Sequence, residues 1–337
     1  MDTEVLMGCV LMTERENLLK VFHRETPAWL PLCSESMLMA GGTFLDMERP
    51  HAGSGIDWFG CKWAGQNEMG GIAHPDTLKA PVVTDITKWR EQAVLPNLDA
   101  LDWQAYETMV QKDVLSLSGR MLEQRLEHTI WERLILLMGF ENALEALLLE
   151  PEACMEYANA MADFRIDLLR RIMSLAQYEL ITYMDDYCSI AGPLMSLDTW
   201  RAIFKEPIRR IGKEIHRLGA LFAIHCCGKC EMLVEDFIEI GADVIDPLQT
   251  CNNQEMIKKN FGELVVFQGG LNNQAVTQVS YPEESAVRAE MRRAIDTLAP
   301  GGGYIIKIQD LSCAKNGLDV KSILIDEYNR YGKNYYV

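Results

Sequence analysis

From about residue 140 onward, stretches with a helical spacing of apolar positions alternate with short runs rich in β-branched and aromatic residues. Residues 151–177 begin with proline and carry apolar side chains three and four positions apart, which is typical of an amphipathic helix. Residues 196–219 have the same period, and Pro207 is expected to kink or divide that helix. Such alternation predicts parallel strands joined by crossover helices.

The apolar runs predict about eight strands, which is the number in a (β/α)8 barrel. They lie at residues 27–35, 70–75 (a weaker segment), 127–137, 179–186, 220–227, 242–249, 263–270 and 302–310. No repeat or Ser/Gly-rich linker divides the chain. We therefore predict an α/β protein, a single (β/α)8 TIM barrel domain over residues 1–337. Its N-terminal region is elaborated, because residues 36–120 hold more loop than a minimal barrel needs.

Composition narrows the class of protein. The chain is 48% hydrophobic and 24% charged, as expected of a globular protein with a core. Its formal net charge of -17 argues against a nucleic-acid partner, because phosphate binding needs concentrated Lys and Arg. The acidic N-terminus does not resemble a secretory signal, and no apolar run approaches the roughly 18 residues that span a bilayer. We expect a cytoplasmic enzyme that binds neither nucleic acid nor membrane.

Polar residues stand at the C-terminal ends of the predicted strands. They are Glu35, Asp185, Asp186, His225, Asp246, Gln268 and Asp310. In a parallel barrel all these ends meet at one rim, where barrel enzymes carry their chemistry. The alternative for any one of them is a purely structural role as the cap of the following helix.

The segment LFAIHCCGKCEML, residues 221–233, concentrates candidate metal ligands. In an extended segment His225 and Cys227 face the same side and Cys226 the other, so imidazole and thiolate can bind one zinc ion together. Cys227 and Cys230 also form a C-x-x-C pair, which leaves a redox site open as an alternative. Cys230 is equally compatible with a core position in the helix that follows.

Two ligands would hold zinc weakly, so a third is expected from elsewhere on the rim. The thiol candidate is Cys313, just past the last strand, and Asp310 and Glu35 are the oxygen alternatives. Three protein ligands with one open position would make the site catalytic.

The C-terminal half resembles the uroporphyrinogen decarboxylase superfamily. The resemblance rests on MDDYCSIAGPLMSLDTW, AIHCCGKCEMLVEDF, FQGGLNN and LAPGGGYII, and spans about residues 140–337. The superfamily contains true decarboxylases and zinc-dependent cobalamin methyltransferases, all on (β/α)8 barrels. True decarboxylases carry an arginine-rich first strand end that grips the substrate carboxylates, whereas WLPLCSESMLMAG in this chain has no arginine.

The methyltransferase branch is the closer resemblance, through the H-x-C-G element at His225, Cys227 and Gly228. That branch places its third ligand, a cysteine, after the last strand, where this chain has Asp310 in register and Cys313 three residues on. The resemblance implies Zn²⁺ as cofactor and methyl transfer between a small substrate (a methoxylated aromatic, a methylamine-like compound or a thiol) and a separate corrinoid protein, as in O-demethylase systems. The chain has no D-x-H-x-x-G element, so the cobalamin would be carried by that partner.

Roles for the remaining rim residues follow from this interpretation. Asp185 and Asp186 are the candidate catalytic groups for proton transfer or substrate positioning. The candidate substrate contacts are Glu35, Tyr187, Asp246 and Gln268. The alternative function is a decarboxylase acting on a porphyrinogen or another acidic substrate, in which Asp185 or Asp186 would stabilise a protonated pyrrole. A third hypothesis is a non-catalytic binding protein on a barrel scaffold.

Overall fold

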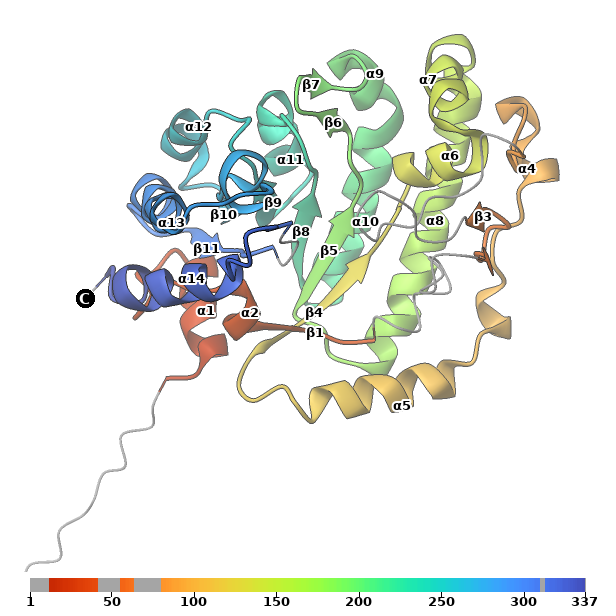
Figure 1. The fold of residues 1–337 in the computed structure, drawn as a ribbon. Helices are drawn as coiled ribbons and strands as arrows, with labels where there is room; N and C mark the ends of the chain where they lie inside the picture. The colour runs from red at the N-terminus through yellow and green to blue at the C-terminus, as the bar shows by residue number, and fades with distance from the viewer. Residues whose placement is uncertain (1–11, 42–54, 64–79, 310–312, 337) are drawn as a thin grey trace, which may run out of the picture.

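The computed structural model describes residues 12–41, 55–63, 80–309 and 313–336. Seven parallel strands form one curled sheet in the order β1-β4-β5-β8-β9-β10-β11 (Figure 1). They are β1 (Met37–Met39), β4 (Met121–Leu126), β5 (Leu180–Met184), β8 (Leu221–His225), β9 (Val244–Leu248), β10 (Val266–Gly269) and β11 (Tyr304–Ile306). Leu32 forms a parallel bridge with Ile306, which links the segment before β1 to the other edge of the sheet. The fold is the predicted (β/α)8 barrel type, and the predicted strand at residues 70–75 lies outside the described residues.

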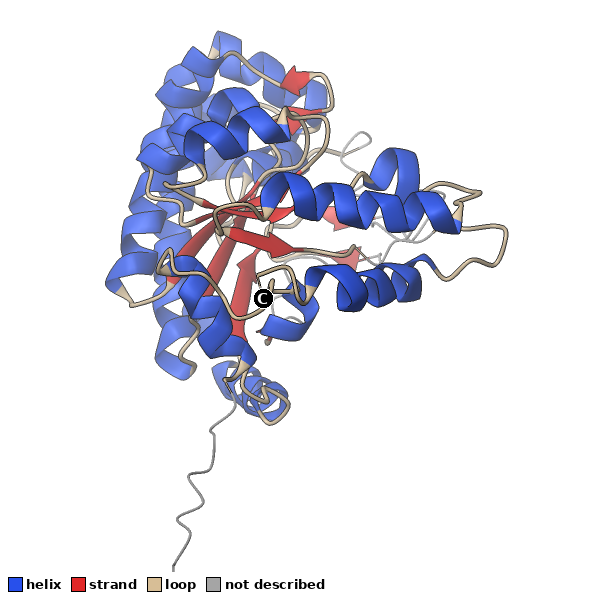
Figure 2. Cartoon of the chain, turned by 90° about the vertical axis from the view of Figure 1, so that its left-hand side faces the viewer, coloured by secondary structure: helices blue, strands red, loops and turns tan. Residues whose placement is uncertain are grey.

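Helices surround the strands, which lie at the centre of the molecule (Figure 2). The longer ones are α1 (Glu14–Phe22), α5 (Trp103–Val114), α6 (Trp131–Met138), α7 (Phe140–Leu149), α8 (Pro151–Leu175), α10 (Glu206–Arg217), α12 (Gln254–Phe261), α13 (Glu284–Leu298) and α14 (Val320–Glu327). The shorter elements are α2 (Cys33–Ser36), α4 (Trp89–Gln92), α9 (Leu197–Trp200), α11 (Val234–Glu239) and the small hairpins β2 (Gly55–Ile56) with β3 (Lys62–Trp63) and β6 (Cys188–Ser189) with β7 (Gly192–Pro193). No helix in the described part of the chain combines the length and the apolar character that a membrane crossing requires.

Both predicted long helices are confirmed. Residues 151–177 correspond to α8, and residues 196–219 form α9 and α10 with a π-helical turn, Arg201–Lys205, between them. Pro207 follows that turn directly and occupies the first turn of α10. A proline has no backbone N–H to bond the preceding turn, so the helix is interrupted at this place.

Two strand predictions were wrong in position. Residues 127–137 form most of α6 instead of a strand, and the strand β4 ends at Leu126. The first strand is β1, so Glu35 lies on α2 before the strand and not at its C-terminal end. Both errors arose because these apolar runs are short. In a short run the spacing of the apolar residues does not distinguish a strand from a helix. The five predicted strands from residue 179 onward are confirmed.

The interior of the barrel changes from apolar to polar along the strands. The layer at the amino ends takes one apolar side chain from each strand: Met37, Met121, Leu180, Ala223, Val244, Val266 and Ile305. Leu18 and Val21 of α1 pack against this layer and close that end. Two positions further along, the side chain is Met39 in β1 and polar in the other six strands: Glu123, Thr182, His225, Asp246, Gln268 and Lys307. Because strand side chains alternate in direction, this second layer also points inward and forms the floor of the carboxyl-end mouth.

Candidate functional site

Three side chains with metal-binding atoms meet at the carboxyl ends of β5 and β8. His225 ends β8 opposite Met184 of β5, and Asp186 and Cys227 each follow two residues later. The Nε2 atom of His225 lies 3.4 Å from the Sγ atom of Cys227 and 3.8 Å from an Oδ atom of Asp186. Within the described ranges this is the one group of three His, Cys, Asp or Glu residues whose ligand atoms all lie within 4.8 Å of one another.

Backbone contacts fix the position of Cys227. Its N–H donates to Asp186 at 2.6 Å, and the next N–H, of Gly228, donates to the side chain of Gln249 at 2.6 Å. Gly228 has φ +92°, and a Cβ there would lie 2.6 Å from the carbonyl oxygen of Ser189, so only glycine fits this turn. Burial raises the pKa of the Cys227 thiol, and the Asp186 carboxylate raises it further. The same negative surroundings favour a cation at this place.

The orientation of His225 is set by a buried ion pair. Its Nδ1 atom lies 2.8 Å from Asp246, which also accepts from Lys307 at 2.6 Å and from Gln268 at 3.0 Å. Burial acts to raise the pKa of Asp246, but the charge of Lys307 and the hydrogen bonds from His225 and Lys307 hold that pKa well below its usual value. The ionised carboxylate accepts the Nδ1 proton, which leaves the lone pair of Nε2 directed toward Cys227 and Asp186.

A cavity of about 450 Å³ opens beside this group at the mouth of the barrel. It is lined by Cys33, Ser34, Met37, Met39, Glu123, Arg125, Met184, His225, Lys307, Ile308 and Gln309. His225 therefore belongs both to the cavity wall and to the three-residue group. The volume lies within the usual range for small-molecule sites.

Asp185 and Tyr187 lie away from the cavity. Both are fully buried. The Asp185 carboxylate accepts the backbone N–H groups of Ile130, Trp131 and Glu132 at 2.8–2.9 Å, where α6 begins, and the hydroxyl of Tyr187 at 2.8 Å. The structure thus gives Asp185 the role of an anion at a helix N-terminus, and Tyr187 the role of its partner.

The other predicted site residues differ in where they lie relative to the three-residue group. Asp246 lies directly behind His225 and orients it, and Gln268 donates a hydrogen bond to Asp246. Glu35 on α2 and the exposed Cys313 do not join the three-residue group. Asp310 lies outside the described residues.

Sequence reasoning missed three charged residues of the barrel interior: Glu123, Arg125 and Lys307. Lys307 is the first residue after the apolar strand β11. A charged residue at the end of an apolar run could therefore have indicated that Lys307 lies at the barrel mouth. Glu123 and Arg125 alternate with Gln124 and Leu126 in β4 and gave no such signal.

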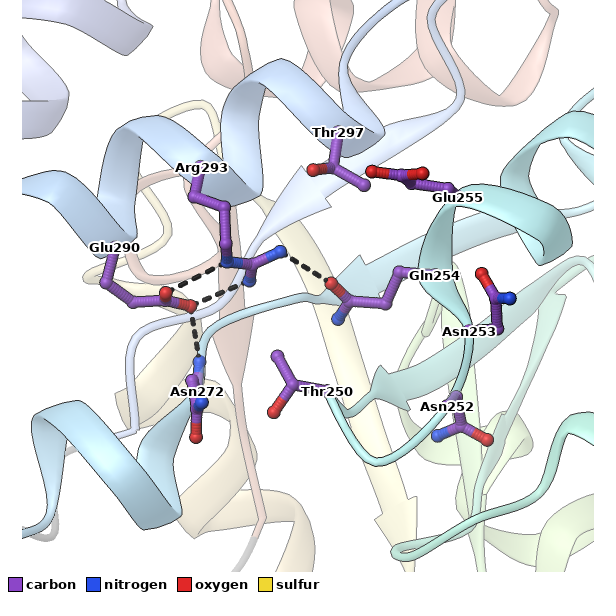
Figure 3. Close-up of a pocket in the computed structure, with 9 residues that line it drawn as sticks. All are labelled: Thr250, Asn252, Asn253, Gln254, Glu255, Asn272, Glu290, Arg293 and Thr297. Carbon is purple, nitrogen blue, oxygen red and sulfur yellow. Dashed lines mark hydrogen bonds and ion pairs between the residues drawn. The ribbon is translucent and has the colours of Figure 1, made fainter.

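A second hollow, of about 360 Å³, lies outside the barrel between α12 and α13 (Figure 3). Two of its charged groups, Arg293 and Glu290, are bonded to each other. Arg293 donates to Gln254 at 2.9 Å, to Glu290 at 2.7 Å and to the carbonyl oxygen of Gly270, and Glu290 accepts the N–H of Asn272. These bonds tie the loops after β9 and β10 to α13, and the carboxylate of Glu255 on α12 also lines the hollow (Figure 3).

Comparisons with known proteins agree with this architecture. The sequence model of the uroporphyrinogen decarboxylase family matches residues 130–308. Among solved structures, a methyltransferase from Methanosarcina mazei has a TM-score of 0.64 at 13% identity, covering 97% of this chain and 100% of that one. A Bacteroidetes-affiliated GH5 cellulase has a TM-score of 0.47 at 9% identity, covering 88% and 95%. No curated protein matches the chain. At 13% identity the likeness to the Methanosarcina mazei methyltransferase concerns the fold alone.

Proposed function

The chain belongs to the uroporphyrinogen decarboxylase family, whose model covers more than half of its 337 residues, and we propose that it is a zinc-dependent methyltransferase. It moves a methyl group between a small substrate and a separate corrinoid protein. The observation that carries this proposal is the meeting of His225, Cys227 and Asp186, with the Nε2 atom of His225 held free by Asp246. The methyltransferase fold of the Methanosarcina mazei neighbour supports it.

The donor set fits zinc. Nitrogen and sulfur are the ligands that Zn²⁺ prefers, and a carboxylate oxygen is an accepted third ligand. We assign that third position to Asp186, whose oxygen lies 3.8 Å from Nε2 of His225, in place of Cys313. Three protein ligands leave one coordination position for the substrate, which is the arrangement of catalytic zinc sites.

Each residue then has a distinct task. A bound zinc ion supplies Lewis-acid activation of the substrate atom that gives or receives the methyl group. His225 is kept in one tautomer and one orientation by Asp246, and Cys227 is held in place through its own N–H and that of Gly228. The cavity next to His225 orients the substrate and excludes water from part of it. Corrinoid chemistry belongs to the partner, and the barrel supplies orientation and electrostatics.

The decarboxylase alternative is less well supported. A porphyrinogen with eight carboxylates needs several fixed cations, and the described cavity wall offers two, Arg125 and Lys307. Decarboxylation would also give no reason for a histidine, a thiol and a carboxylate to meet at one point.

Metal analysis of protein purified without chelator tests the zinc part of the proposal. We expect about one zinc ion per chain, and its loss in a His225→Ala, Cys227→Ala double variant. Cys251→Ser is a matched control, because Cys251 is a partly buried thiol that does not belong to the three-residue group. Wild-type protein without zinc, or an unchanged zinc content in the double variant, would overturn the assignment.

Methyl transfer is tested with free cob(I)alamin as the acceptor. A methoxylated aromatic acid, a methylamine and a methylated thiol are offered in turn, and formation of methylcobalamin is followed by its absorbance. We expect transfer from one class of donor with the wild type and none with the double variant. Zinc-loaded protein that transfers no methyl group from any class would contradict the methyltransferase assignment while leaving the metal site in place.

A further inference from the structure

We propose that the cavity at the barrel mouth is an anion subsite in which Arg125, assisted by Lys307, holds a carboxylate of the substrate. The inference deepens the proposed function and rests on it for the reaction, whereas the subsite itself is a matter of binding. The expected substrate is a small monocarboxylic acid whose methyl group is attached to a heteroatom outside the carboxylate. This heteroatom lies toward His225 when the carboxylate is bound.

Arg125 presents part of its guanidinium group to the cavity. It is the fifth residue of β4, and it donates from Nε to Glu123 at 3.0 Å and from Nη2 to the same carboxylate at 3.4 Å. The Nη1 atom has no hydrogen-bond partner among the residues that the structure describes. A guanidinium group carries five N–H donors in a planar fork, so an unused edge suits the two oxygens of a carboxylate.

Exposure shows which charges an incoming ligand meets. The side chain of Arg125 is 26% exposed and that of its partner Glu123 is 4% exposed. The side chain of Lys307 is 12% exposed and that of its partner Asp246 is 2% exposed. In both pairs the cation is the more exposed partner; Asp246 does not line the cavity, whereas Glu123 lines it beside Arg125. Among the described residues of the wall the two cations are therefore the more exposed charges, which favours an anionic ligand group.

The carboxylates behind the cations are already satisfied. Glu123 accepts from Arg125 and, at 2.7 Å, from the hydroxyl of Thr182. Asp246 accepts from Lys307, His225 and Gln268. Neither carboxylate is free to turn further into the cavity and take the place of a ligand anion, because each would abandon several buried hydrogen bonds.

Apart from Glu123, the remaining described residues of the wall are largely apolar. Met39, Met184 and Ile308 line it, together with Cys33. Burial raises the pKa of the Cys33 thiol to about 12, so this residue adds no negative charge at neutral pH. A ligand with a carboxylate at one end, an apolar body and a methyl-bearing heteroatom near His225 matches this distribution of charge.

Calorimetric binding of matched acid and amide pairs tests the subsite. The probes are benzoate with benzamide, 3-methoxybenzoate with 3-methoxybenzamide, and 3-(methylthio)propanoate with its amide. We expect the acid of at least one pair to bind about tenfold more tightly than its amide, the factor that corresponds to one charge-assisted hydrogen bond. Arg125→Gln removes the preference and Arg125→Lys keeps part of it.

Two further variants separate this inference from the methyltransferase proposal. Arg210→Gln is the matched control, because Arg210 lies on α10 and pairs with Asp163 on the outer surface; it keeps the acid preference. The His225→Ala, Cys227→Ala variant also keeps it, since the subsite does not need the metal. The subsite is overturned if the preference for the acid is lost in this double variant but kept in Arg125→Gln. That result would mean that the ligand carboxylate binds the metal and not Arg125.

Equal binding of acid and amide in all three pairs, or no binding in any of them, overturns the subsite as well. Thermal unfolding of each variant confirms that a lost preference does not reflect unfolding. Should the wild type contain no zinc and yet bind acids through Arg125, the methyltransferase proposal fails and the subsite stands.

Discussion

The Nδ1 atom of His225 lies 2.8 Å from a carboxylate oxygen of Asp246, and this buried contact decides what the other ring nitrogen can do. Because Asp246 is ionised beside Lys307, it accepts the Nδ1 proton and fixes the tautomer in which Nε2 carries a lone pair. Carboxylate partners of this kind orient histidine ligands in many metal sites and increase their basicity. Together with the ion pair between Asp246 and Lys307, this contact links polar side chains at the carboxyl ends of β8, β9 and β11.

Asp246→Asn is therefore expected to weaken zinc binding without removing a ligand. The amide accepts the Nδ1 proton poorly, so the tautomer and orientation of His225 are no longer fixed, and affinity falls by about 10- to 100-fold. Competition with a fluorescent zinc chelator measures the change.

The variant also leaves the Lys307 ammonium group buried without its carboxylate, which costs roughly 3–5 kcal/mol of stability. An Asp246→Asn, Lys307→Met double variant is the control, because it removes both charges and recovers part of that stability. It is expected to keep the weakened zinc affinity. A wild-type zinc affinity in either variant would show that Asp246 does not orient His225.

The third ligand is tested by comparing Asp186→Ala with Cys313→Ser. We expect Asp186→Ala to lower zinc affinity, because it removes an oxygen close to Nε2 of His225. Loss of a residue that only hydrogen-bonds to a metal ligand already lowers affinity ~10-fold, so the loss of a ligand should cost at least that much. Cys313→Ser is expected to bind zinc as the wild type does, because Cys313 lies outside the three-residue group. The same chelator competition measures both, and the reverse result would restore Cys313 as the ligand.

The sequence predicts the rim of the barrel well where strands are followed by polar residues. His225, Cys227, Asp246 and Gln268 come together because the carboxyl ends of neighbouring parallel strands meet, and this follows from topology alone.

Which of two adjacent polar residues faces the site depends on local backbone geometry that the sequence does not reveal. Asp185 and Asp186 are consecutive, so their side chains diverge: the first turns to the N-terminus of α6 and the second to Cys227. The Glu123–Arg125 pair inside the barrel was also out of reach, because these two residues stabilise each other within a strand whose alternation resembles that of an exposed strand. Only the tertiary structure shows that both lie in the interior.

Asp185 is predicted to be a structural residue whose replacement lowers stability and leaves the metal site intact. Asp185→Asn replaces the charged acceptor of three backbone N–H groups at the start of α6. The free energy of unfolding in urea is expected to fall by roughly 2–4 kcal/mol, from the lost charged hydrogen bonds and the lost interaction with the helix dipole.

Asp198→Asn serves as the control for Asp185, since Asp198 is an exposed acidic residue in the first turn of α9. It is expected to change stability by no more than about 0.5 kcal/mol. Zinc content per folded chain stays at the wild-type value in both variants. Loss of zinc in Asp185→Asn with unchanged stability would instead return Asp185 to the catalytic group.

His216 is expected to give the protein a stability term that depends on pH. Its Nε2 atom lies 2.8 Å from Asp243, and this hydrogen bond raises the pKa of His216 although partial burial acts to lower it. The stabilisation is fully present below the pKa of the unfolded chain, about 6.5, and is lost as the pH rises through the higher pKa of the folded chain. Both side chains are partly exposed, so the contribution stays under about 1 kcal/mol.

His216→Gln isolates this pH-dependent contribution. Asp243 keeps the backbone N–H of Phe222 as a donor in the variant, so the carboxylate is not left without a partner. Urea unfolding of wild type and variant at pH about 6 and about 8.5, on either side of the histidine titration, should give a larger stability difference at the lower pH. Other titrating groups cancel in that difference because both proteins share them. A difference that is equal at the two pH values would mean that His216 gains no proton affinity from Asp243 on folding.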